Sequence, residues 1–354
     1  MPKLGDLNHE RTHYWNGDLW QWQPLWLRPA DVVRAVRERF GVPAHALDYL
    51  GDGCLNQSWL VTADDGREYV LRVSREELSR EQIEYEHRLA TALHERVDVV
   101  VAPLPGGDGA TVQRESDRLL SLSPYVQGIL GTQVDPEVRA RESASALARL
   151  HRAAVDLPGF GQRPGFSAVH QPPRWLWHDV EPTLRNALGD DPAYRRLADA
   201  IEREVAELDA WLDELEADRR LSPTAPIHGD FNPRNLLFRD NRLVGVIDFD
   251  GCHVDSIAWE VAQVGFGNPD VDPVAFFRTY LHAGGPLETE DFELLGGFAR
   301  IGCLSEVQWS VDDGVVHPEV HRLLGEVVDG VTWLRNRAAD LGDGGVTTGA
   351  GARS

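Results

Sequence analysis

One short segment, residues 227–250, combines residue types that together can bind a metal ion and activate a hydroxyl group. Asp230 and Asn235 stand in the spacing Asp-x-x-x-x-Asn, and Asp248 follows after two apolar runs. A carboxylate can orient a hydroxyl group and accept its proton, while carboxylate and amide oxygens are suitable ligands for Mg²⁺. Phosphoryl transfer needs both functions, because its catalysis consists mostly of positioning and charge stabilisation. The ordered set therefore predicts a kinase-type site.

A predicted hairpin explains how the two halves of this set would meet. Residues 236–238 and 243–247 are apolar and are separated by a polar turn, a pattern that predicts two paired strands. The second strand would return the chain so that Asp248 lies beside Asn235. Two oxygen ligands for Mg²⁺ would then converge.

Two more polar side chains lie in the same segment. Asp250 adds a third carboxylate as a candidate helper, and His228 is expected to brace the loop by hydrogen bonding rather than to shuttle protons. A metal-dependent hydrolase that uses His228, Asp230, Asp248 and Asp250 as ligands is an alternative. That alternative leaves the Asp-to-Asn spacing unexplained.

The surrounding pattern divides the chain into four parts and predicts an α+β fold. Residues 1–44 form an aromatic-rich arm and a helix, and residues 45–126 alternate strands with one helix, which predicts a small antiparallel sheet. Residues 127–339 are mainly helical and contain the catalytic segment and the expected acceptor site. Residues 340–354 are rich in Gly and Thr and are expected to be a disordered tail.

Composition limits the partners of the chain. It has 354 residues and a formal net charge of −22, which disfavours nucleic acid and anionic membranes and favours a cationic ligand, although acidity also serves solubility alone. No apolar run is long enough for a membrane span, and no signal peptide is apparent. Three widely separated cysteines make a disulfide framework improbable and fit the cytoplasm. Nothing in the pattern indicates an oligomeric state.

The catalytic segment resembles a known family. Residues 227–237 and 246–250 resemble the signature of the aminoglycoside phosphotransferase and choline kinase family, as do residues 147–151 and 259–262. The resemblance covers roughly residues 45 to 265. It implies a two-lobed protein-kinase-like fold, with a small antiparallel-sheet N-lobe and a mainly helical C-lobe. It further implies ATP and Mg²⁺ as cofactors and transfer to a hydroxyl group of a small molecule. Asp230 would be the catalytic base, and Asn235 and Asp248 the metal ligands.

Two positions depart from the family pattern. The predicted third strand carries Arg72 where a phosphate-binding lysine is usual, and Lys3 is the only lysine in the chain. Arginine keeps the charge and can bind phosphate with two donors. Glu86 is its expected ion-pair partner. The alternatives are a surface arginine on an edge strand, a solvated Glu86, and a catalytically silent nucleotide-binding module. The other departure is Glu260, which stands where aspartate usually braces the catalytic loop.

The remaining nucleotide contacts follow from the same resemblance. Gly51, Gly53 and Ser58 are expected to cover the phosphates through backbone N–H groups, although a glycine turn can also be only a turn. Ser123 and Tyr125 lie in the expected hinge, which would contact adenine through the backbone. Another nucleotide donor such as GTP stays open.

The acceptor is expected to bind the helical part of the chain. Trp175 and Asp179 belong to one acidic and aromatic cluster, and Glu306 and Asp312 belong to another. Carboxylates and aromatic faces suit a cationic amine, so an aminoglycoside-like or other amino-bearing alcohol is favoured. Homoserine, choline and a sugar amine are alternatives, and an ordinary helix surface would show the same residues.

Overall fold

The computed structural model describes residues 12–16, 21–51, 55–166, 174–217, 223–267, 271–312 and 314–340. The chain divides into two compact units, and each is described here by itself. The first unit comprises Met1–Gln133, Arg163–Gly165 and Pro233–Gly251, and the second comprises Val134–Gln162, Phe166–Asn232 and Cys252–Ser354. The predicted tail lies outside the described residues beyond position 340.

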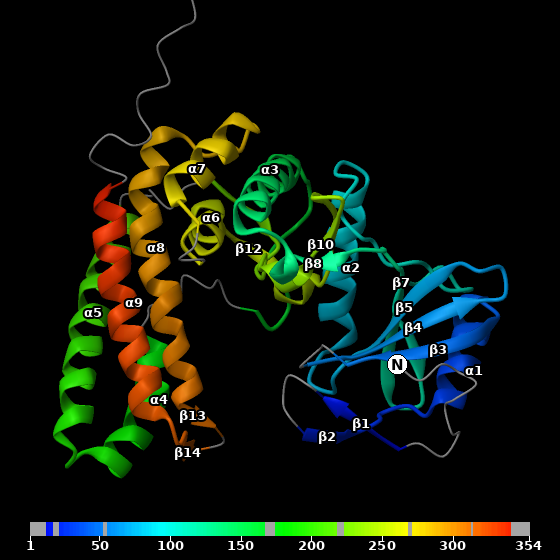
Figure 1. Cartoon of the computed structure of the whole chain (residues 1–354), viewed down its shortest axis with the longest axis horizontal. Helices are drawn as coiled ribbons and strands as arrows, with labels where there is room; N and C mark the ends of the chain where they lie inside the picture. The colour runs from blue at the N-terminus through cyan, green and yellow to red at the C-terminus, as the bar shows by residue number, and fades with distance from the viewer. Residues whose placement is uncertain are drawn as a thin grey trace, which may run out of the picture. The chain divides into compact units, whose positions relative to one another are not determined.

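The first unit is built on a five-stranded antiparallel sheet in the order β3-β4-β5-β7-β6 (Figure 1). Its strands are β3 (Ala44–Leu50), β4 (Gln57–Ala63), β5 (Glu68–Val73), β6 (Gln113–Glu115) and β7 (Arg118–Pro124). Along β4 every second residue is buried, so that Trp59 and Val61 join Leu71 and Val73 of β5 in the core. This alternation is what a half-buried strand requires.

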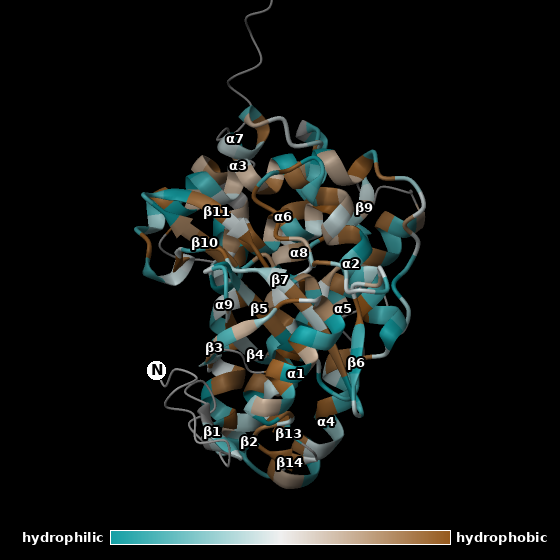
Figure 2. Ribbon diagram, turned by 90° about the vertical axis from the view of Figure 1, so that its right-hand side faces the viewer, coloured by the Kyte–Doolittle hydropathy of each residue, from teal (hydrophilic) through white to brown (hydrophobic). Residues whose placement is uncertain are grey.

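Two helices accompany this sheet. Helix α1 (Pro29–Phe40) buries Val32 and Val36 in the same core, and Figure 2 shows hydrophobic and hydrophilic residues interleaved along it. Helix α2 (Arg80–His94) begins with a capping box, because the Ser79 side chain accepts from the backbone of Gln82 and the Gln82 side chain accepts from the backbone of Ser79. This cap fixes the start of the helix that carries Glu86.

The aromatic arm packs on the sheet of its own unit. Strands β1 (His13–Asn16) and β2 (Gln21–Pro24) pair as a hairpin. The ring of Tyr14 lies 4.1 Å from that of Tyr49 on β3, and the backbone N–H of Trp26 donates to the Gln57 side chain over 2.9 Å. The described part of the arm is therefore part of the first unit.

A second, three-stranded sheet of the first unit carries the metal-ligand segment. It consists of β8 (Ile129–Leu130), β10 (Leu236–Arg239) and β11 (Arg242–Val246), in the order β11-β10-β8. The sequence pattern predicts that residues 233–251 belong to the helical part, whereas in the structure they cluster with the first unit. The physical reason is main-chain pairing: β10 pairs with β8, and Val246 of β11 exchanges backbone hydrogen bonds with the segment around Val100.

The second unit is mainly helical. Its helices are α3 (Pro136–Val155), α4 (Arg174–Leu188), α5 (Pro192–Ala217), α6 (Ile257–Phe266), α7 (Pro273–His282), α8 (Phe292–Ser305) and α9 (Val320–Asp340). Helices α5, α8 and α9 run alongside one another (Figure 1). Helix α8 approaches α6 closely at Gly302, where a Cβ atom would stand 1.9 Å from the Gln263 side chain. The short strands β9 (Thr224–Ile227) and β12 (His253–Ser256) pair with each other in the second unit. The catalytic loop follows β9 in the chain.

These observations confirm the predicted α+β class with an antiparallel sheet. None of the helices in the described part of the chain is long and apolar enough to cross a bilayer. Cys252 and Cys303 are free thiols, and Cys54 lies outside the described residues.

Candidate active site

Arg72 stands at the centre of a partly buried ion-pair cluster in the first unit. Its strand β5 pairs with β4 on one side and β7 on the other, so the residue is not on an edge strand. Arg72 Nη2 lies 2.8 Å from Glu86 Oε2, and Nη1 lies 3.3 Å from Asp248 Oδ1. The structure thus brings together three residues that are distant in sequence and that were each predicted to belong to the site.

The three carboxylates near Arg72 stabilise its positive charge. Burial by itself lowers the pKa of Arg72, but Glu86, Asp248 and Asp250 more than offset this and hold the pKa above its ordinary value. Burial raises the pKa of Glu86, and the ion pair with Arg72 opposes that rise. The Arg72 side chain is therefore a permanent cation that contacts the carboxylate of Asp248, a suitable environment for a phosphate group.

Asn235 and Asp248 lie at the two ends of the β10–β11 hairpin. Leu236 pairs with Val246, and the backbone N–H of Ile247 donates to the Asn235 carbonyl oxygen over 3.0 Å. The Asp248 backbone has φ of +61°, a left-handed conformation that costs a non-glycine residue about 1 to 2 kcal/mol. The Asp248 side chain is 43% exposed. The hairpin therefore supplies the amide and carboxylate at adjacent main-chain positions, as predicted.

This pair of residues suits Mg²⁺ bound together with phosphate. Among the described residues, no three His, Cys, Asp or Glu side chains group as a complete metal cage. Mg²⁺ commonly binds through one or two carboxylates and completes its octahedron with phosphate and water. The accessible carboxylate of Asp248, just after the hairpin that follows Asn235, fits that mode.

Asp250 is surrounded by donors of the protein. Its Oδ2 accepts from Asn56 Nδ2 over 3.2 Å and lies 3.8 Å from Arg75 Nη2, while Oδ1 lies 3.6 Å from Arg163 Nη2. The contact of Arg163 with Asp250 cannot be predicted from the sequence, since a single arginine in a Gly- and Pro-containing loop carries no spacing signal.

The catalytic loop follows β9 in the second unit. Gly229 adopts φ of +79°, which glycine tolerates, and the exposed Asp230 follows it. Asn232 Nδ2 donates to Asp230 Oδ1 over 2.6 Å, and the backbone N–H of Asp230 donates to His228 Nδ1 over 3.2 Å. His228 is buried and contacts the main chain of the loop, the arrangement expected of a brace.

Glu260 of α6 accepts hydrogen bonds from the backbone of the same loop. Its Oε1 accepts from the Gly229 backbone N–H over 2.5 Å and its Oε2 from that of His228 over 3.2 Å. His151 Nε2 lies 2.8 Å from Oε2, and His151 Nδ1 lies 2.8 Å from the Tyr280 hydroxyl. Burial raises the pKa of Glu260, but His151 and the loop donors outweigh it and hold this pKa below its usual value. Glutamate at this position therefore reaches two loop amides.

The structure places the other predicted nucleotide residues in the first unit. Ser58 on β4 is directly opposite Arg72, and Gly51 follows β3, while Gly53 lies outside the described residues. Ser123 pairs with Val70 in the sheet. The Tyr125 N–H donates to the Glu68 carbonyl oxygen over 3.0 Å, so this N–H group is already used within the sheet.

The two predicted acceptor clusters are neighbours in the second unit. Helix α4, which carries Asp179, packs against the 3₁₀ helix η5 (Glu306–Ser310) and the hairpin of β13 (Val311–Asp312) and β14 (Val315–Val316). Asp179, Trp309 and Asp312 are exposed. Burial raises the pKa of Glu306, and a hydrogen bond with Trp309 opposes the rise. The side chain of Trp175 and residue 313 lie outside the described part.

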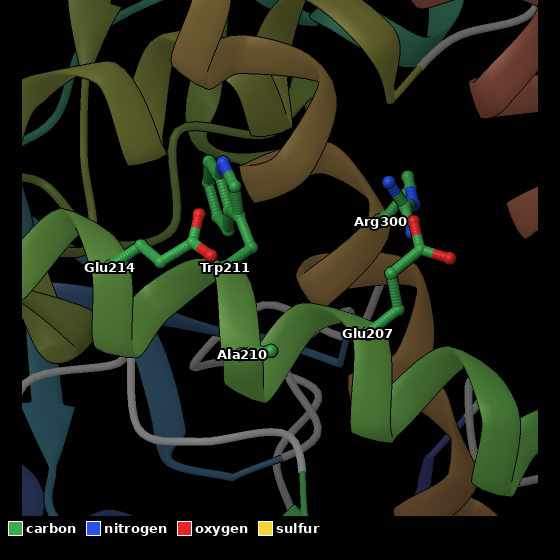
Figure 3. Close-up of a pocket in the computed structure, with 5 residues that line it drawn as sticks. All are labelled: Glu207, Ala210, Trp211, Glu214 and Arg300. Carbon is green, nitrogen blue, oxygen red and sulfur yellow. The ribbon is translucent and has the colours of Figure 1, made fainter.

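A pocket of about 340 Å³ lies elsewhere in the second unit, between α5 and α8 (Figure 3). It is lined by Glu207, Ala210, Trp211, Glu214 and Arg300. Arg300 is paired there with Glu204 and Glu207. None of the predicted site residues lines this pocket.

Sequence comparisons place these features among known proteins. The model of the phosphotransferase enzyme family matches residues 47–296. The homoserine kinase of Rhodospirillum rubrum is 29% identical over 224 residues, which are 60% of this chain and 61% of that protein. The homoserine kinase of Caulobacter vibrioides is 26% identical over 219 residues, covering 60% of this chain and 62% of that protein. The chain thus spans about three fifths of the length of these relatives.

Three solved structures, each named as a kinase or phosphotransferase, share this fold. An amicoumacin kinase in complex with AMP-PNP, Ca²⁺ and its ligand aligns with a TM-score of 0.64 at 15% identity, over 85% of this chain and 93% of that one. An aminoglycoside phosphotransferase from Alicyclobacillus acidocaldarius aligns with a TM-score of 0.64 at 16% identity, over 90% and 96%. A microcompartment-associated aminopropanol kinase aligns with a TM-score of 0.59 at 18% identity, over 88% and 98%. The fold predicted from the sequence is confirmed.

Proposed function

Because the chain belongs to the phosphotransferase enzyme family, we propose that it transfers the γ-phosphoryl group of ATP to a hydroxyl group of a small molecule. The observation that carries the proposal is the cluster of Arg72, Glu86 and Asp248. It joins a permanent, partly buried cation to an accessible carboxylate at the end of a hairpin. This pairing of a phosphate-binding cation with a metal ligand is what phosphoryl transfer requires.

The residues of the first unit hold the nucleotide in this proposal. Arg72 binds the α- and β-phosphates while Glu86 keeps its guanidinium in place. Asn235 and Asp248 are the ligands that would hold Mg²⁺, which when bound neutralises charge on the phosphates. Because the Asp248 side chain is accessible, it can exchange its contact with Arg72 for a metal contact.

The catalytic loop of the second unit acts on the acceptor. Asp230 orients the acceptor hydroxyl and accepts its proton as the oxygen attacks the γ-phosphorus. Asn232 fixes one carboxylate oxygen of Asp230 by a hydrogen bond of 2.6 Å. Glu260 and His228 hold the main chain of the loop, so Asp230 does not need to be ordered when the acceptor arrives.

The acceptor in this proposal is an amino-bearing alcohol. The exposed carboxylates Asp179 and Asp312 and the exposed indole of Trp309 would attract an ammonium group by charge and by cation–π contact. The curated relatives are named homoserine kinases, and homoserine carries both an amine and a hydroxyl. This favours a homoserine-type acceptor over an aminoglycoside-like one.

A panel of acceptors tests the proposal. The protein is incubated with ATP and Mg²⁺ and with homoserine, aminopropanol, choline or an aminoglycoside, and products are measured by mass. We expect a gain of one phosphate on an amino alcohol, matched by ADP release. The deaminated analogue 4-hydroxybutyrate is the matched control for homoserine and should react more slowly. ATP cleavage that needs no acceptor would indicate a hydrolase, and ATP binding without turnover a silent module; either result contradicts the proposal.

A further inference from the structure

Arg163 is an arginine whose place in the first unit has no explanation in the proposed chemistry. It lies in the segment between α3 and α4, and it is 1% exposed, among the largest fully buried side chains of the described residues. Arginine is almost never fully buried unless it is paired. The contacts of the Arg163 side chain therefore indicate why it is buried.

The fork of Arg163 holds one residue at two points. Its Nη1 donates to the backbone carbonyl oxygen of Asp250, and its Nη2 lies 3.6 Å from Asp250 Oδ1. The first of these contacts is a hydrogen bond, whereas the second is an ion pair at a distance longer than a hydrogen bond. Arg163 thus restrains both the main chain and the side chain of Asp250.

Asn56, the residue before β4, also contacts Asp250. Its Nδ2 donates to Asp250 Oδ2 over 3.2 Å, and its Oδ1 accepts from the Arg75 backbone N–H over 3.1 Å. The side chain of Asn56 is nearly buried. Asp250 is consequently anchored to β4, to the end of β5 and to the segment after α3.

The anchored residue belongs to the turn that presents Asp248. The 3₁₀ helix η3 (Phe249–Gly251) directly follows Asp248, whose backbone is left-handed at φ +61°. A non-glycine residue keeps that conformation only when its surroundings impose it. The two-point contact on Asp250 supplies such a restraint two residues away.

We propose that Arg163 is a positioning residue for the metal site, and that Asp250 is its anchor rather than a third metal ligand. Arg163 holds η3 so that the Asp248 carboxylate stays in place to bind a divalent cation beside the nucleotide. This inference rests on the proposed function, because it assumes that Asp248 binds that cation.

Binding of Mn²⁺ in the presence of AMP-PNP tests the inference without requiring turnover. Free Mn²⁺ is measured by electron paramagnetic resonance for the wild type, Arg163→Met, Asp250→Asn and the double variant. We expect each single change to weaken Mn²⁺ binding about tenfold, in the range typical of residues that orient metal ligands. The double variant should be no weaker than either single variant, because both changes break one contact.

Matched controls separate positioning from general damage. Arg34→Met removes an arginine that pairs with Glu115 in the same unit, and it should leave Mn²⁺ binding unchanged. Arg163→Lys keeps the charge but loses the fork, and it should weaken binding by a smaller factor; this variant decides the matter if Arg163→Met does not fold.

Two results would overturn the inference. Wild-type Mn²⁺ affinity in Arg163→Met and Arg163→Lys, with a loss in Asp250→Asn, would make Asp250 a direct ligand. Multiplied losses in the double variant would show that the two residues act separately. A failure of the proposed function appears differently, since phosphorylation would then be absent in the wild type even where Mn²⁺ binds.

Discussion

At the scale of single residues, Glu260 shows how a buried carboxylate can set the geometry of a loop. It accepts two backbone N–H groups of the catalytic loop and pairs with His151, which in turn contacts Tyr280. Charge-assisted hydrogen bonds of this kind are stronger than neutral ones. The loop that carries Asp230 is thereby tied to α3, α6 and α7.

The Glu260→Gln variant tests this brace. Glutamine offers one acceptor oxygen where two are used, so the free energy of unfolding at pH 7 should fall by about 2 kcal/mol. The folded-state pKa of Glu260 lies below 4.5, so its stabilisation is complete above pH 4.5 and is lost as pH falls through that lower pKa. The two proteins should therefore converge in stability in acid. Urea denaturation at pH 7 and below pH 4 measures both effects.

The control for this variant is Glu214→Gln, which changes an exposed glutamate of α5. It should shift the unfolding free energy by less than about 0.5 kcal/mol. Equal stability of wild type and Glu260→Gln at pH 7 would show that Glu260 does not stabilise the loop. A difference in unfolding free energy that persists in acid would assign the effect to packing.

At the scale of single residues, contacts can be expected from the sequence where the spacing of residues carries the signal. The Asp-to-Asn spacing, the hairpin between Asn235 and Asp248, and the pairing of Arg72 with Glu86 could all be expected from local pattern and family resemblance. Asn56 with Asp250 could not, since 194 positions separate them and nothing in either neighbourhood marks the contact. Such contacts depend on the tertiary fold.

At the scale of elements, the buried side chain of Gln57 joins the N-terminal arm to the sheet, in addition to the contact of Tyr14 with Tyr49. Gln57 is 1% exposed, its Nε2 donates to the Pro24 carbonyl oxygen over 2.8 Å, and its Oε1 accepts from the Trp26 N–H over 2.9 Å. A side-chain amide that pairs with the backbone in this way replaces a strand partner. Gln57 also adjoins Asn56, so the arm supports the start of β4.

The Gln57→Ala variant tests this connection. Loss of both hydrogen bonds should lower the free energy that protects the Trp26 amide from exchange by about 1 to 2 kcal/mol. Native-state hydrogen exchange measures this amide directly. Gln113→Ala is the matched control, because Gln113 is a buried glutamine of the same unit that bonds Asp108. Unchanged protection of Trp26 in Gln57→Ala would show that the arm is held by its aromatic contacts alone.

The sequence predicts most of the helices and strands, but it does not predict which unit each short strand joins. Alternation along β4 and the polar turn of the β10–β11 hairpin are local signals. The two-residue strand β8 has no such signal, yet it pairs with β10 and so ties that hairpin to the first unit. Partner choice between distant short strands is a tertiary property.

At the scale of the whole molecule, the net charge of −22 gives the chain a field that favours cationic ligands. If the acceptor arrives as a cation, its KM should rise about threefold between 50 and 500 mM ionic strength, because salt screens exposed charges. A zwitterionic acceptor such as homoserine should show a much smaller rise. Steady-state kinetics with one acceptor of each kind measures the difference, and equal salt dependence would contradict a role for the net charge.

Replacement of Asp230, the proposed catalytic base, tests the mechanism. Turnover of the acceptor and the dissociation constant of ATP are measured side by side for the wild type and for Asp230→Ala. For Asp230→Ala we expect an ATP dissociation constant within about twofold of the wild type. We expect turnover to be lower by about 10²- to 10⁴-fold, because a catalytic base has been removed. Turnover near that of the wild type would contradict the mechanism.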